Sequence, residues 1–326
     1  MLARIGGYHL GWWGAEGDAL PTPVPSKVLR PTLVLLAAEA AGWDGRDGRG
    51  VAAGAAAVEL VHNWSLLHDD VIDNDQLRRG RATAWTVYGT GWAILAGDAL
   101  LAAAKERLLD AGEHGVQALA LLLRAVSALV AGQAADLDFA HRDPAGITVE
   151  EYLAMAAGKT SALLECSLGI GALLGGADRA TAEALHQAGH HLGLAWQAAN
   201  DVEGIWGDPA ITGKPAMGDL REHKPTLPLL AALHDPAPRQ SQALRGRLRN
   251  QSCWPEPESL AALIDQAGGR AAAQTLSQRH LAQALSYLSQ APLLLHTLTE
   301  LQQLFTYIVT RTTMPWTPHR FARTQP

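Results

Sequence analysis

Four aspartates fall within seven residues of the stretch from Leu60 to Arg81, which reads LVHNWSLLHDDVIDNDQLRRGR. Asp69 follows an apolar run with helical spacing, and Asp73 lies four residues later, on the same face of a helix. Asp70 lies beside them, so two or three carboxylates are expected to converge on one point. Because like charges repel there, the stretch predicts a helix whose end holds a cation.

Arginines follow these aspartates. Mg2+ takes oxygen ligands and typically combines one or two carboxylates with water and with phosphate oxygens of a substrate. The guanidinium groups of Arg78 and Arg79 are suited to bidentate binding of phosphate oxygens. The pattern therefore predicts a metal-bridged diphosphate. An acidic helix end followed by a solvated basic loop is the simpler alternative, which the apolar approach and the RRGR exit disfavour.

The segment HDDVIDNDQLRRGR resembles the first aspartate-rich motif of the trans-isoprenyl diphosphate synthases, also called polyprenyl synthetases. Among them it resembles the actinobacterial type of geranylgeranyl diphosphate synthase, and the resemblance extends over most of the chain. It implies the fold that this family shares with class I terpene cyclases, an all-α helical bundle around a central cavity. It also implies that Asp69, Asp70 and Asp73 hold Mg2+, with three ions in the whole site. Arg78 is implied to contact an allylic prenyl diphosphate.

Apolar residues make up 48% of the chain and recur at helical spacing in segments such as AVELVHNWSLLH and ALALLLRAVSALV. This pattern favours an all-helical protein. No linker or break in composition divides the chain between Pro31 and Leu233, so we expect one helical domain over residues 27–326. Residues 1–26 carry three prolines and several glycines, which predicts an irregular N-terminal arm.

The net charge of −6 gives no basic surface for nucleic acid. Charges such as Asp98 and Arg124 interrupt the long apolar runs, whereas a membrane span needs about 20 apolar residues in a row. The two cysteines, Cys166 and Cys253, form no disulfide framework. We therefore expect a soluble, cytoplasmic protein without a membrane span. The family resemblance further implies a homodimer.

A second basic motif, SKVLRP, places Lys27 and Arg30 just before an apolar helix. It resembles the GGKxxRP motif of the family, although both glycines are replaced here. In that motif the two basic residues hold isopentenyl diphosphate, and the positions that His62 and Arg79 match contribute to the same site. A histidine on an apolar helix is, by itself, more typical of a core residue. The resemblance nevertheless implies a complete pocket for a second diphosphate.

Trp64 lies five residues before Asp69, where a large ring is expected to end the cavity for the allylic tail. Through the resemblance, this favours a tail of about fifteen to twenty carbons. The resemblance implies that the diphosphate is contacted by Lys159, Lys214 and Lys224, and that Thr160 and Gln197 also bind the substrate. Trp196 is a candidate for the aromatic wall that keeps water from the allylic cation.

The largest departure from the family lies in the segment AWQAANDVEGIWGD, where Asn200 and Asp201 stand in place of two aspartates. Asn200, Gly204 and Asp208 are spaced by four, so a continuous helix would place them on one face. This spacing resembles the NDxx(S/T/G)xxx(E/D) metal motif of class I terpene cyclases. We therefore expect Asn200, Asp201 and Asp208 to bind a further Mg2+, with one negative charge fewer than usual.

Two activities share the ionisation of an allylic diphosphate and differ in what captures the resulting cation. Asn200, Pro225, the altered GGKxxRP motif and the many tryptophans favour a diterpene cyclase that acts on geranylgeranyl diphosphate. This is the function that we predict from the sequence. The retained pocket for isopentenyl diphosphate favours the alternative, a short-chain prenyltransferase such as a farnesyl or geranylgeranyl diphosphate synthase. An inactive partner subunit is a third hypothesis, which the intact first motif disfavours.

Overall fold

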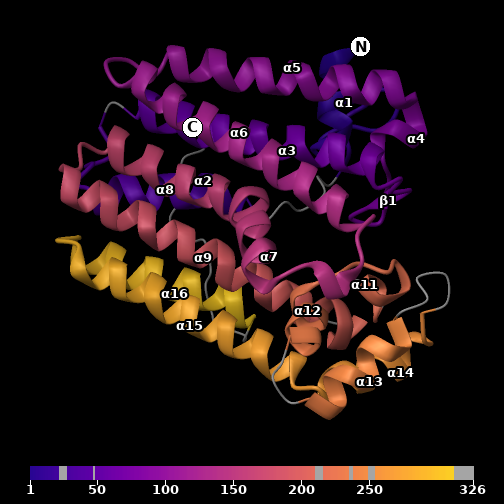
Figure 1. The fold of residues 1–326 in the computed structure, drawn as a ribbon. Helices are drawn as coiled ribbons and strands as arrows, with labels where there is room; N and C mark the ends of the chain where they lie inside the picture. Colours follow the sequence, from indigo (N-terminus) through magenta and orange to yellow (C-terminus); the bar gives the residue numbers. More distant parts are fainter. Residues whose placement is uncertain (22–27, 47, 210–215, 235–237, 249–253, 312–326) are drawn as a thin grey trace. The chain divides into compact units, whose positions relative to one another are not determined.

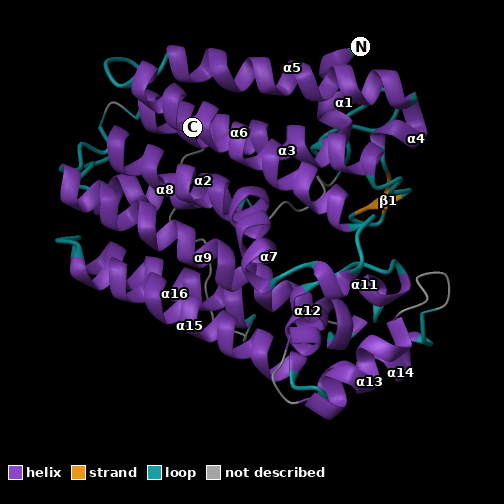
Figure 2. Ribbon diagram, viewed as in Figure 1, coloured by secondary structure: helices purple, strands orange, loops and turns teal. Residues whose placement is uncertain are grey.

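The computed structural model describes residues 1–21, 28–46, 48–209, 216–234, 238–248 and 254–311. Within these residues the regular elements are helices, apart from one short hairpin (Figure 2). The predicted all-α fold is therefore confirmed. The chain groups into two compact units: unit 1 comprises Met1–Val126 and Cys166–Glu183, and unit 2 comprises Ser127–Glu165 and Ala184–Pro326. The single domain expected over residues 27–326 stays a prediction.

Unit 1 is built around the long helix α3 (Arg49–Ile72). This helix packs against α2 (Leu29–Ala40) and runs side by side with α5 (Thr90–Leu109), as Figure 1 shows. Gly54 allows close packing on another side, since an added Cβ there would lie 2.7 Å from Cγ2 of Ile170. The helix that carries the aspartates at its C-terminal end is therefore fixed along its length by apolar contacts.

A two-stranded hairpin follows α3 directly (Figure 2). Strands β1 (Leu77–Arg78) and β2 (Arg81–Ala82) pair antiparallel, with Arg78 opposite Arg81. The two turn residues, Arg79 and Gly80, have φ values of 52° and 74°. Positive φ at both central residues is the requirement of a type I′ turn, whose twist matches that of the two flanking strands. Helix α4 (Ala84–Tyr88) comes next and packs against α5.

The N-terminal residues differ from the predicted irregular arm, because Leu2–His9 forms the helix α1. Ile5 and Tyr8 are buried, and the helix packs against α5. Gly7 lies so close to Trp13 that an added Cβ would come within 2.2 Å of the indole ring. The glycine that weakens the helix by its propensity is therefore needed where the chain folds back onto it. Burial outweighs propensity in this segment.

Three helices contribute residues to both units, namely α6 (Gly115–Phe139), α8 (Ala162–Leu174) and α9 (Arg179–Trp206). The other helices of unit 2 are shorter on average. They are η1 (Pro144–Gly146), α7 (Val149–Ala156), η2 (Ala157–Ser161), α11 (Gly218–Arg221), α12 (Leu227–His234), α13 (Pro238–Leu248), α14 (Pro257–Gln266), α15 (Gly269–Gln290) and α16 (Leu295–Thr310). Within unit 2, α15 packs against α12 and α16 (Figure 1).

Helix α7 begins with a capping box formed by Thr148 and Glu151. The threonine hydroxyl accepts the N–H of Glu151 at 3.1 Å, and the glutamate carboxylate accepts the N–H of Thr148 at 2.8 Å. The helix then widens into the π-helical turn η2 before α8 continues the chain. π-Helical turns are rare in proteins, and those that occur often lie at functional sites. Two of the predicted substrate residues, Lys159 and Thr160, lie on it.

One helix in the described part of the chain, α6, is long and apolar enough to cross a membrane. Core helices of water-soluble proteins meet the same criteria of length and composition. A single helix of this kind is weak evidence for a membrane span.

The close packing of α9 against η2 gives a test of the fold. An added Cβ at Gly193 would lie 2.3 Å from Cα of Ser161, so Gly193→Ala forces the backbone of η2 to move. We expect a loss of about 1–3 kcal/mol of stability. The control is Gly246→Ala in α13, where nothing lies within 4 Å of an added Cβ and the change favours the helix by up to about 1 kcal/mol. Thermal unfolding measures both, and equal melting temperatures would contradict the packing.

Candidate active site

The end of α3 holds its three predicted aspartates in different environments. Asp70 is buried, with 1% of its surface exposed, and its Oδ1 forms an ion pair with Nε of Arg78. Asp69 is half-buried. Asp73 is the exposed C-cap residue, whose N–H donates to the carbonyl of Asp69 at 2.8 Å. Of the two or three carboxylates predicted to converge on one point, that of Asp70 is turned into a buried ion pair, which leaves Asp69 and Asp73 for the point of convergence.

The first motif still fits a metal ion that also binds a substrate. Asp69 and Asp73 lie one turn apart, and Mg2+ needs only one or two carboxylates when phosphate and water complete its shell. Oδ2 of Asp70 is a buried oxygen without a hydrogen-bond donor among the described residues. Within the same residues, no three His, Cys, Asp or Glu side chains are grouped so that they could hold a metal ion. Oxygen atoms of a ligand or of water must therefore complete the shell.

Arg78 ties the helix end to the hairpin. Besides Asp70 it reaches Asp75, with Nη2 3.4 Å from Oδ2. Burial raises the pKa of Asp70 to about 6, while the charge and hydrogen bond of Arg78 act in the opposite direction. The guanidinium of Arg78 thus favours the ionised form of Asp70, whereas burial disfavours that form.

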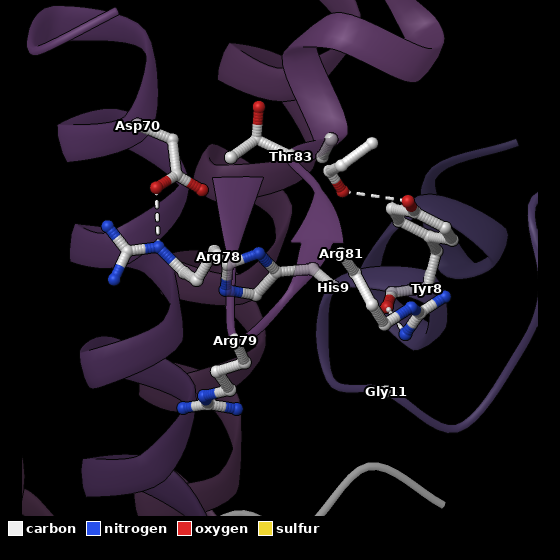
Figure 3. A pocket seen from close by; sticks show the side chains of 10 residues that line it. Tyr8, His9, Gly11, Asp70, Arg78, Arg79, Arg81 and Thr83 are labelled. Atoms are coloured by element: carbon white, nitrogen blue, oxygen red, sulfur yellow. Dashed lines mark hydrogen bonds and ion pairs between the residues drawn. The ribbon is translucent and has the colours of Figure 1, made fainter. Parts of the chain in front are cut away.

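Figure 3 shows a small cavity beside the hairpin, in which His9 lies between Arg78 and Arg81. Arg81 donates to the carbonyls of Tyr8 and Trp13 at 3.1 and 3.0 Å. The Tyr8 hydroxyl donates to the carbonyl of Ala82 at 2.7 Å, so β2 is bonded to α1 and to the loop after it. Burial and then the neighbouring guanidinium charges lower the pKa of His9 to about 3. The imidazole is therefore neutral near pH 7.

A cationic cluster formed by the half-buried Arg30 and His62 and the more exposed Arg79 lies in the same unit. Burial lowers the pKa of Arg30 to about 10, and the carboxylate of Glu59 acts against this shift. Burial also lowers the pKa of His62 well below its usual value, assisted by the charges of Arg30 and Arg79. Partial burial lowers the pKa of Arg79, again against the charge of Glu59. Three of the four residues predicted to bind isopentenyl diphosphate are thus within electrostatic reach of one another.

Unit 2 brings together four predicted substrate residues on η2 and α9. Nζ of Lys159 forms an ion pair with Oδ2 of Asp136 on α6. Oγ1 of Thr160 donates to Oε1 of Gln197 at 2.7 Å. Trp196 precedes Gln197 on α9 and is half-buried. The lysine and the threonine of η2 are therefore both oriented by side chains of neighbouring helices.

Asp201 is buried among three protein donors. Its Oδ2 accepts the hydroxyl of Tyr152 and, at 3.2 Å, the N–H of Leu227, while its Oδ1 accepts the amide of Gln197 at 2.9 Å. Burial raises the pKa of Asp201 to about 7, against the hydrogen bond from Tyr152. Burial and the charge of Asp201 raise the pKa of Tyr152 well above its usual value. The carboxyl is thus largely satisfied by the protein itself.

Asn200 is bonded to a residue from the far end of the chain. Its Oδ1 accepts Nη2 of Arg311, the C-cap residue of α16, at 2.6 Å. Nη1 of the same arginine forms an ion pair with Oε2 of Glu203 at 2.6 Å. The predicted continuation of the helical face to Asp208 is wrong, because α9 ends at Trp206 and Asp208 is exposed beyond that end.

The second motif therefore does not fit a metal ion in the arrangement that the structure shows. The amide oxygen of Asn200 and the carboxylate of Glu203 already bind a guanidinium. Both oxygens of Asp201 accept protein hydrogen bonds. A cation would have to displace Arg311 before it could approach these oxygens.

The remaining predicted residues are less informative. Lys27 and Lys214 lie outside the described residues. Lys224 forms an ion pair with the glutamate two residues before it, at 2.6 Å. Trp64 is buried and meets the ring of His68 edge to face, with 5.5 Å between the ring centroids. The place of Trp64 at the end of a tail cavity stays a prediction.

Comparison with known proteins identifies the family. The polyprenyl synthetase family model matches residues 21–264. The chain belongs to the polyprenyl synthetase family. A (2E,6E)-farnesyl diphosphate synthase from Mycobacterium bovis is 43% identical over 309 residues, 93% of this chain and 84% of that protein. A geranylgeranyl diphosphate synthase from Mycobacterium tuberculosis is 43% identical over 293 residues, 89% and 82% of the two chains. The crystal structure of a polyprenyl synthetase from Streptomyces coelicolor A3(2) superimposes with a TM-score of 0.86 at 40% identity, covering 94% and 92%.

Membership in the polyprenyl synthetase family confirms the resemblance that the first aspartate-rich motif carries, and with it the all-α isoprenoid synthase fold. The two Mycobacterium relatives are named as synthases of prenyl diphosphates. The comparisons therefore favour the prenyltransferase alternative and give no support to the diterpene cyclase that the sequence analysis preferred.

Several residues at the two motifs are absent from the sequence-based predictions. Tyr152 and Arg311 hydrogen-bond the second motif, His9 lies among the hairpin arginines, and the charge of Glu59 acts on the cationic cluster. Glu59 had a local signal, since it lies three residues before His62 on the same helical face. The other three contacts join residues far apart in the sequence, and no spacing rule indicates them.

The hydrogen bond between Tyr152 and Asp201 predicts that removing the tyrosine hydroxyl destabilises the protein by an amount that depends on pH. The folded pKa of Asp201, about 7, lies above its ordinary value of 3.8, so its contribution to stability is complete at low pH and is lost as the pH rises toward 7. Tyr152→Phe removes a donor to the carboxylate and raises that pKa further. We expect a cost of about 1 kcal/mol near pH 5 and about 2–3 kcal/mol near pH 9, where a buried carboxylate loses the bond.

Urea unfolding in EDTA at the two pH values measures this difference. In an Asp201→Asn background the substitution of Tyr152 should cost the same at both pH values, because the amide does not titrate. An equal cost at both pH values with Asp201 present would show that the hydroxyl does not serve the carboxylate.

Proposed function

We propose that this polyprenyl synthetase is a short-chain trans-prenyltransferase, which condenses isopentenyl diphosphate with an allylic prenyl diphosphate. The observation that carries the proposal is the cationic cluster of Arg30, His62 and Arg79, in which the first two side chains are half-buried. A prenyltransferase binds two diphosphates, whereas a cyclase binds one. A second set of guanidinium groups, those of Arg30 and Arg79, supports the binding of two diphosphates.

The charges in unit 1 support this proposal. The charges of Arg30, Arg79 and Arg78 all act on His62, and each lowers its pKa. Glu59 is the carboxylate that acts on both Arg30 and Arg79. Because these two guanidinium groups share the carboxylate of Glu59, the cluster is suited to bind an anion. A bound diphosphate would replace the solvation that these guanidinium groups lose on burial.

The proposed mechanism uses the first acidic motif with Arg78, and the cationic cluster of Arg30, His62 and Arg79. The carbon–oxygen bond of the allylic diphosphate breaks, and its electron pair leaves with the diphosphate. The double bond of isopentenyl diphosphate then attacks the allylic cation, a carbon–carbon bond forms, and loss of one proton restores a double bond. Arg78, held by the buried carboxylate of Asp70, is the donor that unit 1 offers to the leaving group.

Mg2+ is the proposed cofactor, held by Asp69 and Asp73 with the buried oxygen of Asp70 behind them. When bound, it neutralises the charge that develops on the diphosphate. The cationic cluster orients isopentenyl diphosphate, and the neutral His62 can donate an N–H to it without adding charge.

A cytoplasmic homodimer is the proposed form of the enzyme. Supporting the dimer, α5 and the start of α6 expose large apolar side chains, which mark protein contacts when they form a continuous patch. These residues are Trp92, Ile94, Leu95, Leu109, Val116 and Leu123.

The proposed activity has a direct test. With Mg2+, isopentenyl diphosphate and a shorter allylic diphosphate, we expect release of diphosphate and a prenyl diphosphate of about fifteen to twenty carbons. The upper end of that range follows from the expectation that Trp64 ends the tail cavity. Geranylgeranyl diphosphate alone should give no hydrocarbon or terpene alcohol. Hydrocarbon from that substrate alone, without growth on isopentenyl diphosphate, would establish the cyclase instead.

The cationic cluster can be tested by Arg79→Met. Loss of one charged hydrogen bond to a diphosphate costs about 1.5–3 kcal/mol, so we expect the KM for isopentenyl diphosphate to rise about 10- to 100-fold. The KM for the allylic diphosphate should change little. The control is Arg107→Met on α5, which removes an exposed ion pair with Asp110 and should leave both values unchanged. Equal increases in both KM values would place Arg79 at the allylic diphosphate.

A further inference from the structure

We propose that Arg311 serves as a built-in cation at the second acidic motif, in the place where that motif would otherwise hold a metal ion. Asn200 is then a partner of the guanidinium and not a metal ligand. The inference rests on the proposed function only in assuming that the chain binds a metal-bridged diphosphate.

The geometry is that of one guanidinium shared between two neighbouring residues of α9. Nη2 lies 2.6 Å from the amide oxygen of Asn200, and Nη1 lies 2.6 Å from a carboxylate oxygen of Glu203. The side chains of Arg311 and Glu203 are 28% and 26% exposed, so the pair is largely withdrawn from water. Both terminal nitrogens of the planar guanidinium are used, which fixes the group in orientation as well as in position.

The backbone of Arg311 supports the assignment. The residue ends α16 in the left-handed region, with φ 48° and ψ 17°, and its N–H donates to the carbonyl of Tyr307 at 2.9 Å. Residues with a Cβ rarely adopt this conformation, which is common for glycine at the end of a helix. Here the unfavourable conformation occurs at the residue whose side chain reaches across to α9, so the contact with α9 offsets its cost.

The charges explain why residue 200 is an asparagine. Arg311 and Glu203 neutralise each other, and the amide of Asn200 adds an acceptor without a further negative charge. An aspartate at this position would leave the group with a surplus negative charge, and so with an affinity for a second cation. With asparagine the group is balanced by the protein alone.

The rest of the motif is consistent with this assignment. Asp201 accepts hydrogen bonds at both oxygens from Tyr152, Gln197 and Leu227. Gly204 lies against Asp219, since an added Cβ would come within 2.0 Å of Oδ2 and would displace that carboxylate. The segment thus keeps the order of a metal motif while its groups are committed to contacts within unit 2.

The first experiment uses the metal-free full-length protein. In EDTA, Arg311→Met should lower the melting temperature, because Glu203 and Asn200 lose their donor in a partly buried place. Arg107→Met makes the same chemical change at an exposed ion pair and should leave the melting temperature unchanged. If Arg311→Met behaves like this control, the contact does not exist in solution and the proposal fails.

The second experiment counts bound metal without turnover. Equilibrium dialysis of Mn2+ with inorganic pyrophosphate should give the same number of ions per chain for the wild type and Asn200→Ala. Asp69→Asn should bind at least one ion fewer, which verifies that the assay detects the first motif. The double variant Asn200→Asp/Arg311→Met, which has an added carboxylate and no guanidinium, should bind one ion more.

Loss of one Mn2+ in Asn200→Ala would show that the amide is a metal ligand and would overturn the proposal. That count remains decisive if Arg311→Met does not fold. Neither experiment measures prenyl transfer. A failure of the proposed activity would appear in the assay with isopentenyl diphosphate and would leave the metal count unaffected.

Discussion

The buried ion pair between Asp70 and Arg78 is the contact on which the arrangement of the first motif and its hairpin depends. Asp70 is 1% exposed, and removing one partner of such a pair leaves an uncompensated charge that typically costs about 3–5 kcal/mol. The pair joins the last turn of α3 to β1, and the hairpin turn then places Arg79 in the left-handed region one residue later. The side chain of Arg79 thereby comes within reach of Glu59 and His62. One buried carboxylate thus determines where the next arginine lies.

The parts of the fold that short-range patterns determine could be predicted from the sequence. The helical character of the chain and the end of α3 at the aspartates follow from apolar spacing within a few turns. The helix α1 could not be predicted, because its sequence contains two glycines and its stability comes from burial against α5. The hairpin was missed as well, since its strands have two residues each and are held by Arg81 through the carbonyls of Tyr8 and Trp13.

The same distinction applies to the site. Asp69 and Asp73 could be paired from their spacing, because both lie at the end of one helix. Arg30, His62 and Arg79 were brought together by family resemblance and not by spacing, since three separate elements carry them. For the second motif, spacing alone was misleading because it assumes that the helix continues. A local signal against this was present: Pro209 disfavours helical backbone at the residue before it, and α9 ends at Trp206.

The two acidic motifs differ in how their charges are balanced, and this difference bears on the choice between cyclase and prenyltransferase. At the first motif, a buried oxygen of Asp70 has no donor among the described residues, which suits a cation that arrives with the substrate. At the second motif, Arg311 already balances Glu203 and binds Asn200. The asparagine that resembles a cyclase metal ligand is therefore explained by a contact within unit 2. Once Asn200 has this partner, its identity no longer argues for cyclase chemistry, and the cationic cluster of Arg30, His62 and Arg79 supports the proposed second diphosphate.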